Sequence, residues 1–256
     1  MALIKMNYLS SVLYRTVNVN VILPTDRIDY ATGEYCMEIG QRFPTLYLLH
    51  GMLGSENDWV SGTRIQRWAE ERNLAVVMPA GENAYYEDYG PGRDYGRFIG
   101  KELVDMTRRM FPLSDHREDT FIAGLSMGGF GAIHNGIRYS ETFSHIAAFS
   151  PATHVFESEV WDPMFEMLFG NRTEAEKTER NPRVAWERLR EEGRPEPKFY
   201  ISCGTEDELL PYARVYRDFL RGEGAEVTYR EEPGAGHEWD FWDREVLKAI
   251  EWFLAR

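Results

Sequence analysis

The chain has 256 residues, a length that one hydrophobic core can serve, and 43% of them are hydrophobic. This apolar content and the interleaving of both charge signs exclude a wholly disordered chain. It carries 42 acidic against 29 basic residues, a formal net charge of -13, which disfavours nucleic acid and anionic membrane surfaces as partners.

Short apolar runs typical of strands alternate with helical patterns along most of the chain. We expect strands at Met1–Leu9, Val12–Leu23, Thr45–His50, Leu74–Met78, Thr120–Ala123, His145–Ser150, Lys198–Cys203 and Glu226–Arg230. We expect helices at Thr63–Arg72, Tyr95–Phe111, Met127–Tyr139, Ala185–Glu192, Pro211–Arg221 and Asp240–Leu254.

Several of the predicted strands are nearly continuous apolar runs, such as TLYLLH, LAVVMP, TFIAG and HIAAFS, which indicates burial on both faces of a parallel sheet. The first two alternate between apolar and polar residues, which favours antiparallel strands at an edge of the sheet. The sequence therefore predicts an α/β fold in a single domain, 1–256, with a mostly parallel eight-stranded sheet flanked by helices.

The alternation breaks after the sixth predicted strand, between Pro151 and Pro197. We interpret 151–197 as a small cap insertion. Within it, Trp161 and Phe165 share one face of a predicted short helix. Two interpretations stay open: these rings form a substrate-binding wall, or they pack the cap onto the body of the protein.

Two cysteines, Cys36 and Cys203, cannot form a disulfide framework, and we expect both to be buried, reduced thiols. No metal-binding motif is present, and no cofactor is expected. No stretch reaches the length of a membrane span, so we expect a cytoplasmic protein without a membrane partner. A homo-oligomer is compatible with the sequence.

The sharpest motif is GLSMG at 124–128, a GxSxG pentapeptide between a predicted strand and a predicted helix. In this motif the serine occupies a tight turn that exposes its hydroxyl at the end of the sheet. The chain approaches itself two residues before and two residues after the serine, where only small residues fit. Ser126 is therefore the predicted nucleophile.

A second motif, HGMLG at 50–54, follows the predicted strand Thr45–His50. A loop of this kind supplies the first oxyanion donor in α/β-hydrolases. Two backbone N–H groups aimed at the developing negative charge stabilise a tetrahedral intermediate. We assign these N–H groups to Met52 and Met127. His50 is interpreted as a structural imidazole and not as the catalytic base.

The base and the acid follow from the chain order of α/β-hydrolases, which is serine, then aspartate or glutamate, then histidine. Of the six histidines, His237 is the one placed after the last predicted strand. Three consecutive carboxylates, Glu206, Asp207 and Glu208, follow the strand before it. We choose Asp207, because a short side chain on a tight loop is held more rigidly, and the two glutamates stay open as alternatives.

Four segments in the same order, LLHGMLGSENDW, IAGLSMGGFGA, CGTEDELL and GHEWDFW, resemble the esterase D-like α/β-hydrolases. The tributyrin esterases and the rumen-type feruloyl (cinnamoyl) esterases are the most similar groups in this branch. The resemblance covers nearly the whole chain. It implies a serine carboxylesterase without metal or cofactor, with Ser126, Asp207 and His237 as the triad and the amides of Met52 and Met127 as the oxyanion hole.

The predicted function is hydrolysis of a small-molecule ester, with a short acyl or a feruloyl group, through an acyl-enzyme. Acyl transfer to an alcohol or sugar acceptor by the same residues is the alternative. S-formylglutathione hydrolases share the branch, but their usual threonine-cysteine oxyanion loop and GHSMGG elbow are not found here, so this activity ranks low. A non-catalytic binding protein also ranks low, because the serine, acid and histidine are all in place.

Overall fold

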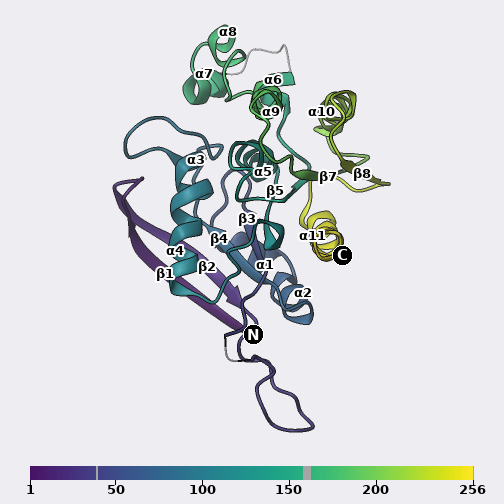
Figure 1. Ribbon diagram of the computed structural model, residues 1–256. Helices are drawn as coiled ribbons and strands as arrows, with labels where there is room; N and C mark the ends of the chain where they lie inside the picture. The colour runs from purple at the N-terminus through teal and green to yellow at the C-terminus, as the bar shows by residue number, and fades with distance from the viewer. Residues whose placement is uncertain (39, 158–162, 256) are drawn as a thin grey trace.

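The computed structural model describes residues 1–38, 40–157 and 163–255. Its centre is an eight-stranded sheet in the order β1-β2-β4-β3-β5-β6-β7-β8 (Figure 1). The strands are β1 Ala2–Ser10, β2 Arg15–Leu23, β3 Thr45–Leu49, β4 Ala75–Pro79, β5 Thr120–Leu125, β6 His145–Phe149, β7 Lys198–Gly204 and β8 Val227–Glu232. The β1–β2 and β2–β4 pairs are antiparallel, and the pairs from β4 to β8 are parallel. This arrangement confirms the mostly parallel sheet predicted from the sequence.

Helices cover both faces of the sheet. They are α1 Asp58–Gly62, α2 Ile65–Glu71, α3 Tyr95–Arg97, α4 Leu103–Met110, α5 Met127–Arg138, α6 His154–Glu157, α7 Pro163–Phe169, α8 Arg172–Ala175, α9 Pro182–Glu191, α10 Leu210–Gly222 and α11 Trp239–Leu254. Helices α1, α2 and α11 contribute to one hydrophobic core, and α4, α5, α9 and α10 contribute to the other.

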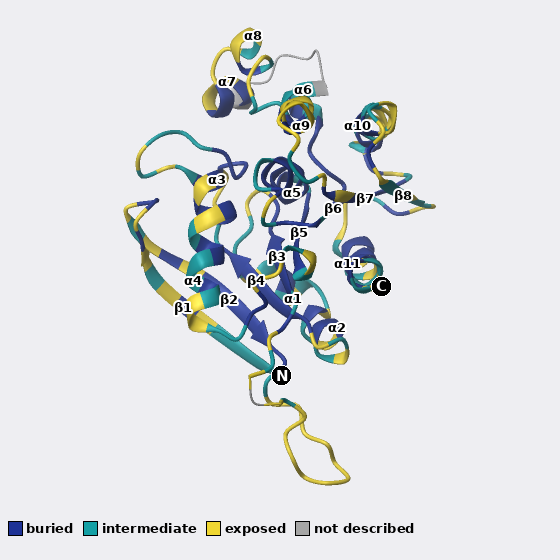
Figure 2. Ribbon diagram, viewed as in Figure 1, coloured by how far each residue is buried: buried dark blue, intermediate teal, exposed yellow. Residues whose placement is uncertain are grey.

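The strand sequence reflects these two cores. In β3, Tyr47 and Leu49 point into the core with α4 and α5, whereas Leu46 and Leu48 point into the core with α2 and α11. Successive side chains of a strand alternate between faces, so a central strand with a core on each side must be apolar at every position. All five residues of β3 are buried (Figure 2).

The helix predicted at Tyr95–Phe111 is interrupted. It consists of α3, a π-helical turn at Phe98–Glu102 and α4. Gly100 lies in this turn, and a Cβ on it would be 2.0 Å from the ring of Tyr139. The tyrosine ring therefore packs directly on the helix backbone at the irregular turn, a contact between distant segments that the helical pattern does not reveal.

The expectation of two buried thiols is wrong for Cys36. Cys203 is buried in β7, but Cys36 is exposed in the segment between β2 and β3. Figure 2 shows that part of this segment extends away from the sheet as an exposed loop. The segment is rich in charged and small residues, such as TDRIDYATGE, and so offers little apolar surface for a core.

The segment 151–197, called the cap below, leaves the sheet between β6 and β7, as predicted. Its described residues include α6, α7, α8 and α9, which lie above α5 in Figure 1. Nowhere in 1–38, 40–157 or 163–255 is a helix both long and apolar enough to span a membrane.

Candidate active site

Four polar residues follow the carboxyl ends of four neighbouring parallel strands. Ser126 follows β5, Ser150 follows β6, Asp207 lies in the loop after β7, and His237 lies in the loop after β8. Parallel strands end at the same edge of a sheet, which is where open α/β sheets place their ligands. The candidate site is therefore at this edge.

Ser126 has a strained backbone, with φ 54° and ψ -118°. A non-glycine residue with positive φ persists only where its surroundings hold it. Here a Cβ on Gly124 would lie 2.3 Å from the carbonyl oxygen of Gly128, and a Cβ on Gly128 would lie 2.5 Å from that of Leu49. The two glycines of the GxSxG motif are thus required by direct backbone contacts, as the motif predicts.

The loop after β3 lies beside the predicted nucleophile. A Cβ on Gly51 would be 3.5 Å from the Cβ of Ser126. The next residue is Met52, whose N–H is one of the two predicted oxyanion donors. The other predicted donor, Met127, is the first residue of α5, where backbone N–H groups have no acceptor within the helix.

Asn83, which the sequence analysis missed, holds this loop. Its Oδ1 accepts a hydrogen bond of 2.7 Å from the N–H of Leu53, a residue with φ 64°. The loop is further closed by a bond of 3.2 Å from Gly54 N–H to the carbonyl of Gly51. An asparagine in a turn after a strand is too common in sequences to mark such a role by itself.

His50 has the structural role assigned to it. Its Nε2 accepts a bond of 2.9 Å from the N–H of Gly81, and its Nδ1 lies 2.7 Å from the carbonyl oxygen of Gly51. Nδ1 therefore carries the proton, and neither ring nitrogen is free to act as a base. Burial lowers the pKa of His50, which favours this neutral form.

Asp207 and His237 form the pair expected of an acid and a base. His237 Nδ1 lies 2.9 Å from Asp207 Oδ2, and the other carboxylate oxygen accepts a bond of 2.9 Å from the N–H of Leu209. Burial raises the pKa of Asp207, but hydrogen bonds from His237, Ser150 and Leu209 outweigh it, and the pKa lies below its usual value. The aspartate is therefore ionised at neutral pH.

The three consecutive carboxylates differ in their exposure to solvent. The side chain of Asp207 is buried, whereas Glu206 and Glu208 are exposed. The side chain of His237 is 35% exposed. An imidazole between a buried carboxylate and solvent can exchange protons with a substrate while its other nitrogen is held by the carboxylate.

Backbone contacts fix the loops of the acid and the base to each other. The N–H of Glu206 donates to the carbonyl of Ala235 over 2.9 Å, and the N–H of Gly234 donates to Thr205 Oγ1 over 2.8 Å. A Cβ on Gly204 would lie 2.1 Å from the carbonyl oxygen of Ala235. The relative position of the two side chains is thus set before any substrate binds.

Among the described residues there is no hydrogen bond from the Ser126 hydroxyl to His237. Such bonds are often long in enzymes without substrate and tighten in the complex. Backbone bonds nevertheless tie Ser126 to the segment after β6: its N–H donates to the carbonyl of Phe149 over 2.9 Å, and its carbonyl accepts from Ala152 over 3.0 Å.

Of the two cap residues tentatively assigned to substrate, Trp161 lies outside the described residues. Phe165 is 2% exposed, and its ring centroid lies 5.3 Å from that of Phe156 and 5.0 Å from that of Phe169. The guanidinium of Arg172 lies 4.6 Å from the ring centroid. These contacts fit the interpretation that Phe165 packs the cap.

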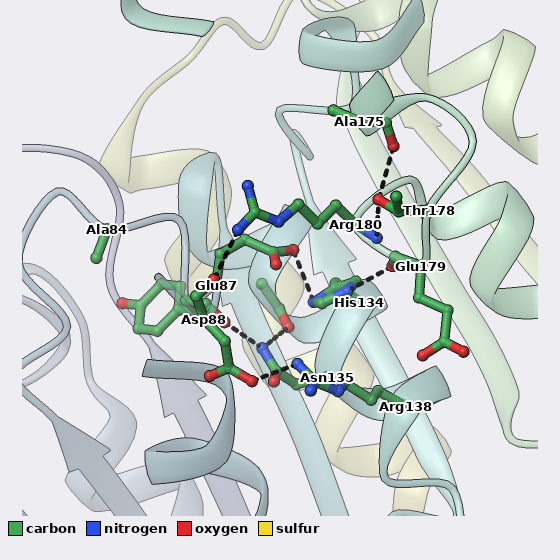
Figure 3. A network of polar contacts seen from close by, with 12 residues as sticks. Ala84, Glu87, Asp88, His134, Asn135, Arg138, Ala175, Thr178, Glu179 and Arg180 are labelled. Atoms are coloured by element: carbon green, nitrogen blue, oxygen red, sulfur yellow. Dashed lines mark hydrogen bonds and ion pairs between the residues drawn. The ribbon is translucent and has the colours of Figure 1, made fainter. Parts of the chain in front are cut away.

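A polar network joins the cap to the body beneath it (Figure 3). His134 of α5 places Nδ1 2.9 Å from Glu87 Oε1 and Nε2 2.8 Å from the carbonyl oxygen of Glu179 in the cap. Arg180 donates to the carbonyl of Asp88 over 2.9 Å. A cavity of about 400 Å³ lies among these residues, and its lining includes none of the predicted triad.

Three comparisons with known proteins show which family and which solved structures the chain is similar to. The model of a family described as "Putative esterase" matches residues 10–253. An acetyl esterase of Caldicellulosiruptor saccharolyticus is 34% identical over 98% of both chains. Among solved structures, a fluorophosphonate-binding serine hydrolase of Staphylococcus aureus is 31% identical, with a TM-score of 0.87 over 100% of this chain and 99% of that one. An S-formylglutathione hydrolase of the same organism is also 31% identical, with a TM-score of 0.85 over 99% of both.

Proposed function

The chain belongs to the esterase family, and from this premise we propose that it hydrolyses small carboxylic esters through an acyl-enzyme on Ser126. The acyl groups are short, with acetyl first among them, and feruloyl esters form a second group of candidate substrates. The similarity to an acetyl esterase over 98% of both chains supports the preference for a short acyl group.

In the proposed mechanism, Ser126 Oγ attacks the ester carbonyl carbon while His237 Nε2 takes the hydroxyl proton. The N–H groups of Met52 and Met127 stabilise the resulting oxyanion. The intermediate collapses as the protonated imidazole gives its proton to the leaving alcohol. Water, deprotonated by the same nitrogen, then releases the carboxylic acid and restores Ser126. Asp207 remains ionised throughout and stabilises the imidazolium.

One observation carries this proposal: the buried Asp207 is hydrogen-bonded to a half-buried His237 at the sheet edge where the strained Ser126 follows β5. A structural turn needs neither the strained serine nor a desolvated carboxylate behind a solvent-facing imidazole.

The test has two parts. A fluorophosphonate probe should add once to the parent protein, as seen by intact mass, and not to Ser126→Ala. A panel of p-nitrophenyl acetate, butyrate and octanoate with methyl ferulate should then show hydrolysis that is fastest for the short acyl groups. Ser126→Ala should fold and lose on the order of 10⁶ in kcat. Ser61→Ala, an exposed serine in α1, serves as the matched control.

Hydrolysis of the thioester S-formylglutathione is the second candidate function. The likeness to an S-formylglutathione hydrolase at 31% identity favours it. The same triad can attack a thioester, whose thiolate leaving group needs less help from a general acid. A kcat/KM for S-formylglutathione more than about 100-fold above that for p-nitrophenyl acetate, close to 3 kcal/mol, would assign the thioester as the substrate. Diversion of the acyl group to an added alcohol would instead reveal a transferase.

A further inference from the structure

Ser150 follows β6, the strand between the two that lead to Ser126 and Asp207. It is fully buried and has φ 46°, an uncommon value for a residue with a Cβ. Its N–H donates to the carbonyl of Ser202 in β7 over 2.8 Å. The neighbouring strand therefore holds this backbone in a conformation that fixes where the Ser150 hydroxyl points.

The Ser150 hydroxyl lies between an indole and a carboxylate. Trp242 Nε1 donates to Ser150 Oγ over 3.2 Å, so the indole uses a lone pair of the oxygen. The hydroxyl proton remains available, and an interaction with the Ser150 hydroxyl lowers the pKa of Asp207. An ionised carboxylate only accepts, so the serine is the donor.

The thiol of Cys203 also interacts with Ser150 and Asp207. Burial raises the pKa of this thiol, which therefore stays neutral. Asp207 is then the charged acceptor for the hydroxyl, and hydrogen bonds to a charged acceptor are the stronger ones. Hydrogen bonds join Trp242 to Ser150 and His237 to Asp207, and the interaction between Ser150 and Asp207 links the two pairs.

We propose that Ser150 is a positioning residue for the triad: its hydroxyl, oriented by Trp242, holds the Asp207 carboxylate where it bonds His237. The proposal rests on the proposed ester hydrolysis and adds a fourth side chain to its machinery. Trp242 reinforces the arrangement, because its ring meets the imidazole edge-on, with centroids 4.9 Å apart and an interplanar angle of 88°.

Loss of the hydroxyl has two expected consequences. The carboxylate loses a donor and is free to turn away from His237, which lowers the rate. While it remains bonded to His237, the carboxylate attracts the imidazole proton more strongly, so the rising limb of the pH–rate profile moves to higher pH. A hydrogen bond to a charged group that is fully used in the transition state corresponds to roughly a tenfold to hundredfold loss of rate.

The experiment compares Ser150→Ala with Ser202→Ala. Ser202 is a matched control, because its hydroxyl is buried nearby and has no hydrogen-bond partner among the described residues. The readouts are the second-order rate of fluorophosphonate labelling, the kcat/KM for p-nitrophenyl acetate and its pH profile. Each serine variant is made both in the parent and in Asp207→Asn.

We expect Ser150→Ala to lose roughly tenfold to hundredfold in both rates and Ser202→Ala to stay within about threefold. In the Asp207→Asn background, Ser150→Ala should cause less than about a threefold further loss, because the residue acts through the carboxylate. A merely structural role would give the same factor in both backgrounds and would overturn the proposal.

Ser150→Gly also lacks the hydroxyl but relieves the positive φ, so it should lose as much as the alanine variant. A glycine variant with the parent rate would assign the effect to the backbone and refute the role of the hydroxyl. If the parent reacts with the probe but hydrolyses no ester, the proposed function fails, and the labelling rates still decide the role of Ser150. A parent that does not react with the probe would refute both.

Discussion

Gly128→Ala is the sharpest test of the geometry around the candidate nucleophile. The new Cβ would lie 2.5 Å from the carbonyl oxygen of Leu49 and 2.6 Å from that of His50. Both atoms belong to the backbone, so no side-chain rotation relieves the contact. The start of α5 and the end of β3 must separate by about 1 Å, and a misplacement of that size can cost about 100-fold in rate.

This separation moves the Met127 N–H, just after Ser126, away from the Met52 loop, which follows β3. We therefore expect kcat to fall about 100-fold, close to 3 kcal/mol in activation free energy, with a smaller change in KM. The assay is hydrolysis of p-nitrophenyl acetate, with circular dichroism to verify folding. Gly222→Ala is the control, because a Cβ at that helix position meets nothing within 4 Å. A folded Gly128→Ala with kcat within threefold of the parent would refute the reasoning.

Three further outcomes are expected. Asp207→Asn should lower kcat roughly 10³- to 10⁴-fold, whereas Glu206→Gln, at an exposed position, should keep kcat within about tenfold of the parent. A large loss for Glu206→Gln and a small loss for Asp207→Asn would contradict the choice of Asp207 as the acid. Burial lowers the pKa of His145 from 6.5 to about 4. Between these two pH values the unfolded chain binds a proton that the native protein does not bind, so the free energy of unfolding should fall as the pH drops from 6.5 to about 4. His145→Gln should flatten that part of a plot of denaturation midpoint against pH, and an unchanged slope would contradict the assignment. Phe165→Ala should cost about 3 kcal/mol of stability and lower kcat/KM for p-nitrophenyl acetate and methyl ferulate by the same factor. A larger loss on methyl ferulate would instead favour the interpretation that Phe165 contacts the substrate.

The strands could be predicted because their sequence pattern is local. In β3, the run LYLL is apolar because the strand has a core on each face, and all eight predicted strands are present. The π-helical turn at Phe98–Glu102 could not be predicted, because it packs against the ring of Tyr139 beyond the next strand. Burial of Cys36 was expected from residue type alone, and the polar composition of its segment decided otherwise.

The candidate triad could be predicted from chain order, because each of its members follows its own strand. Ser150 could not, although it also ends a predicted strand. Its importance depends on the adjacency of β6 and β7 and on an indole from α11, and neither is visible in a run of residues. Asn83 was missed for the same reason, since its partner Leu53 lies on a separate loop.

The backbone contact of Gly128 with Leu49 and His50 has a consequence for how such a protein can diversify. The turn at the candidate nucleophile and the candidate oxyanion loop meet through main-chain atoms. A side chain added at this contact would push the two segments apart. We therefore expect the two segments to stay unchanged together when the protein diversifies. The cap is joined to the body through side chains such as His134 and Arg180, which single mutations can exchange. Laboratory selection for new substrates should therefore accumulate changes in the cap and leave residues 49–52 and 124–128 unchanged.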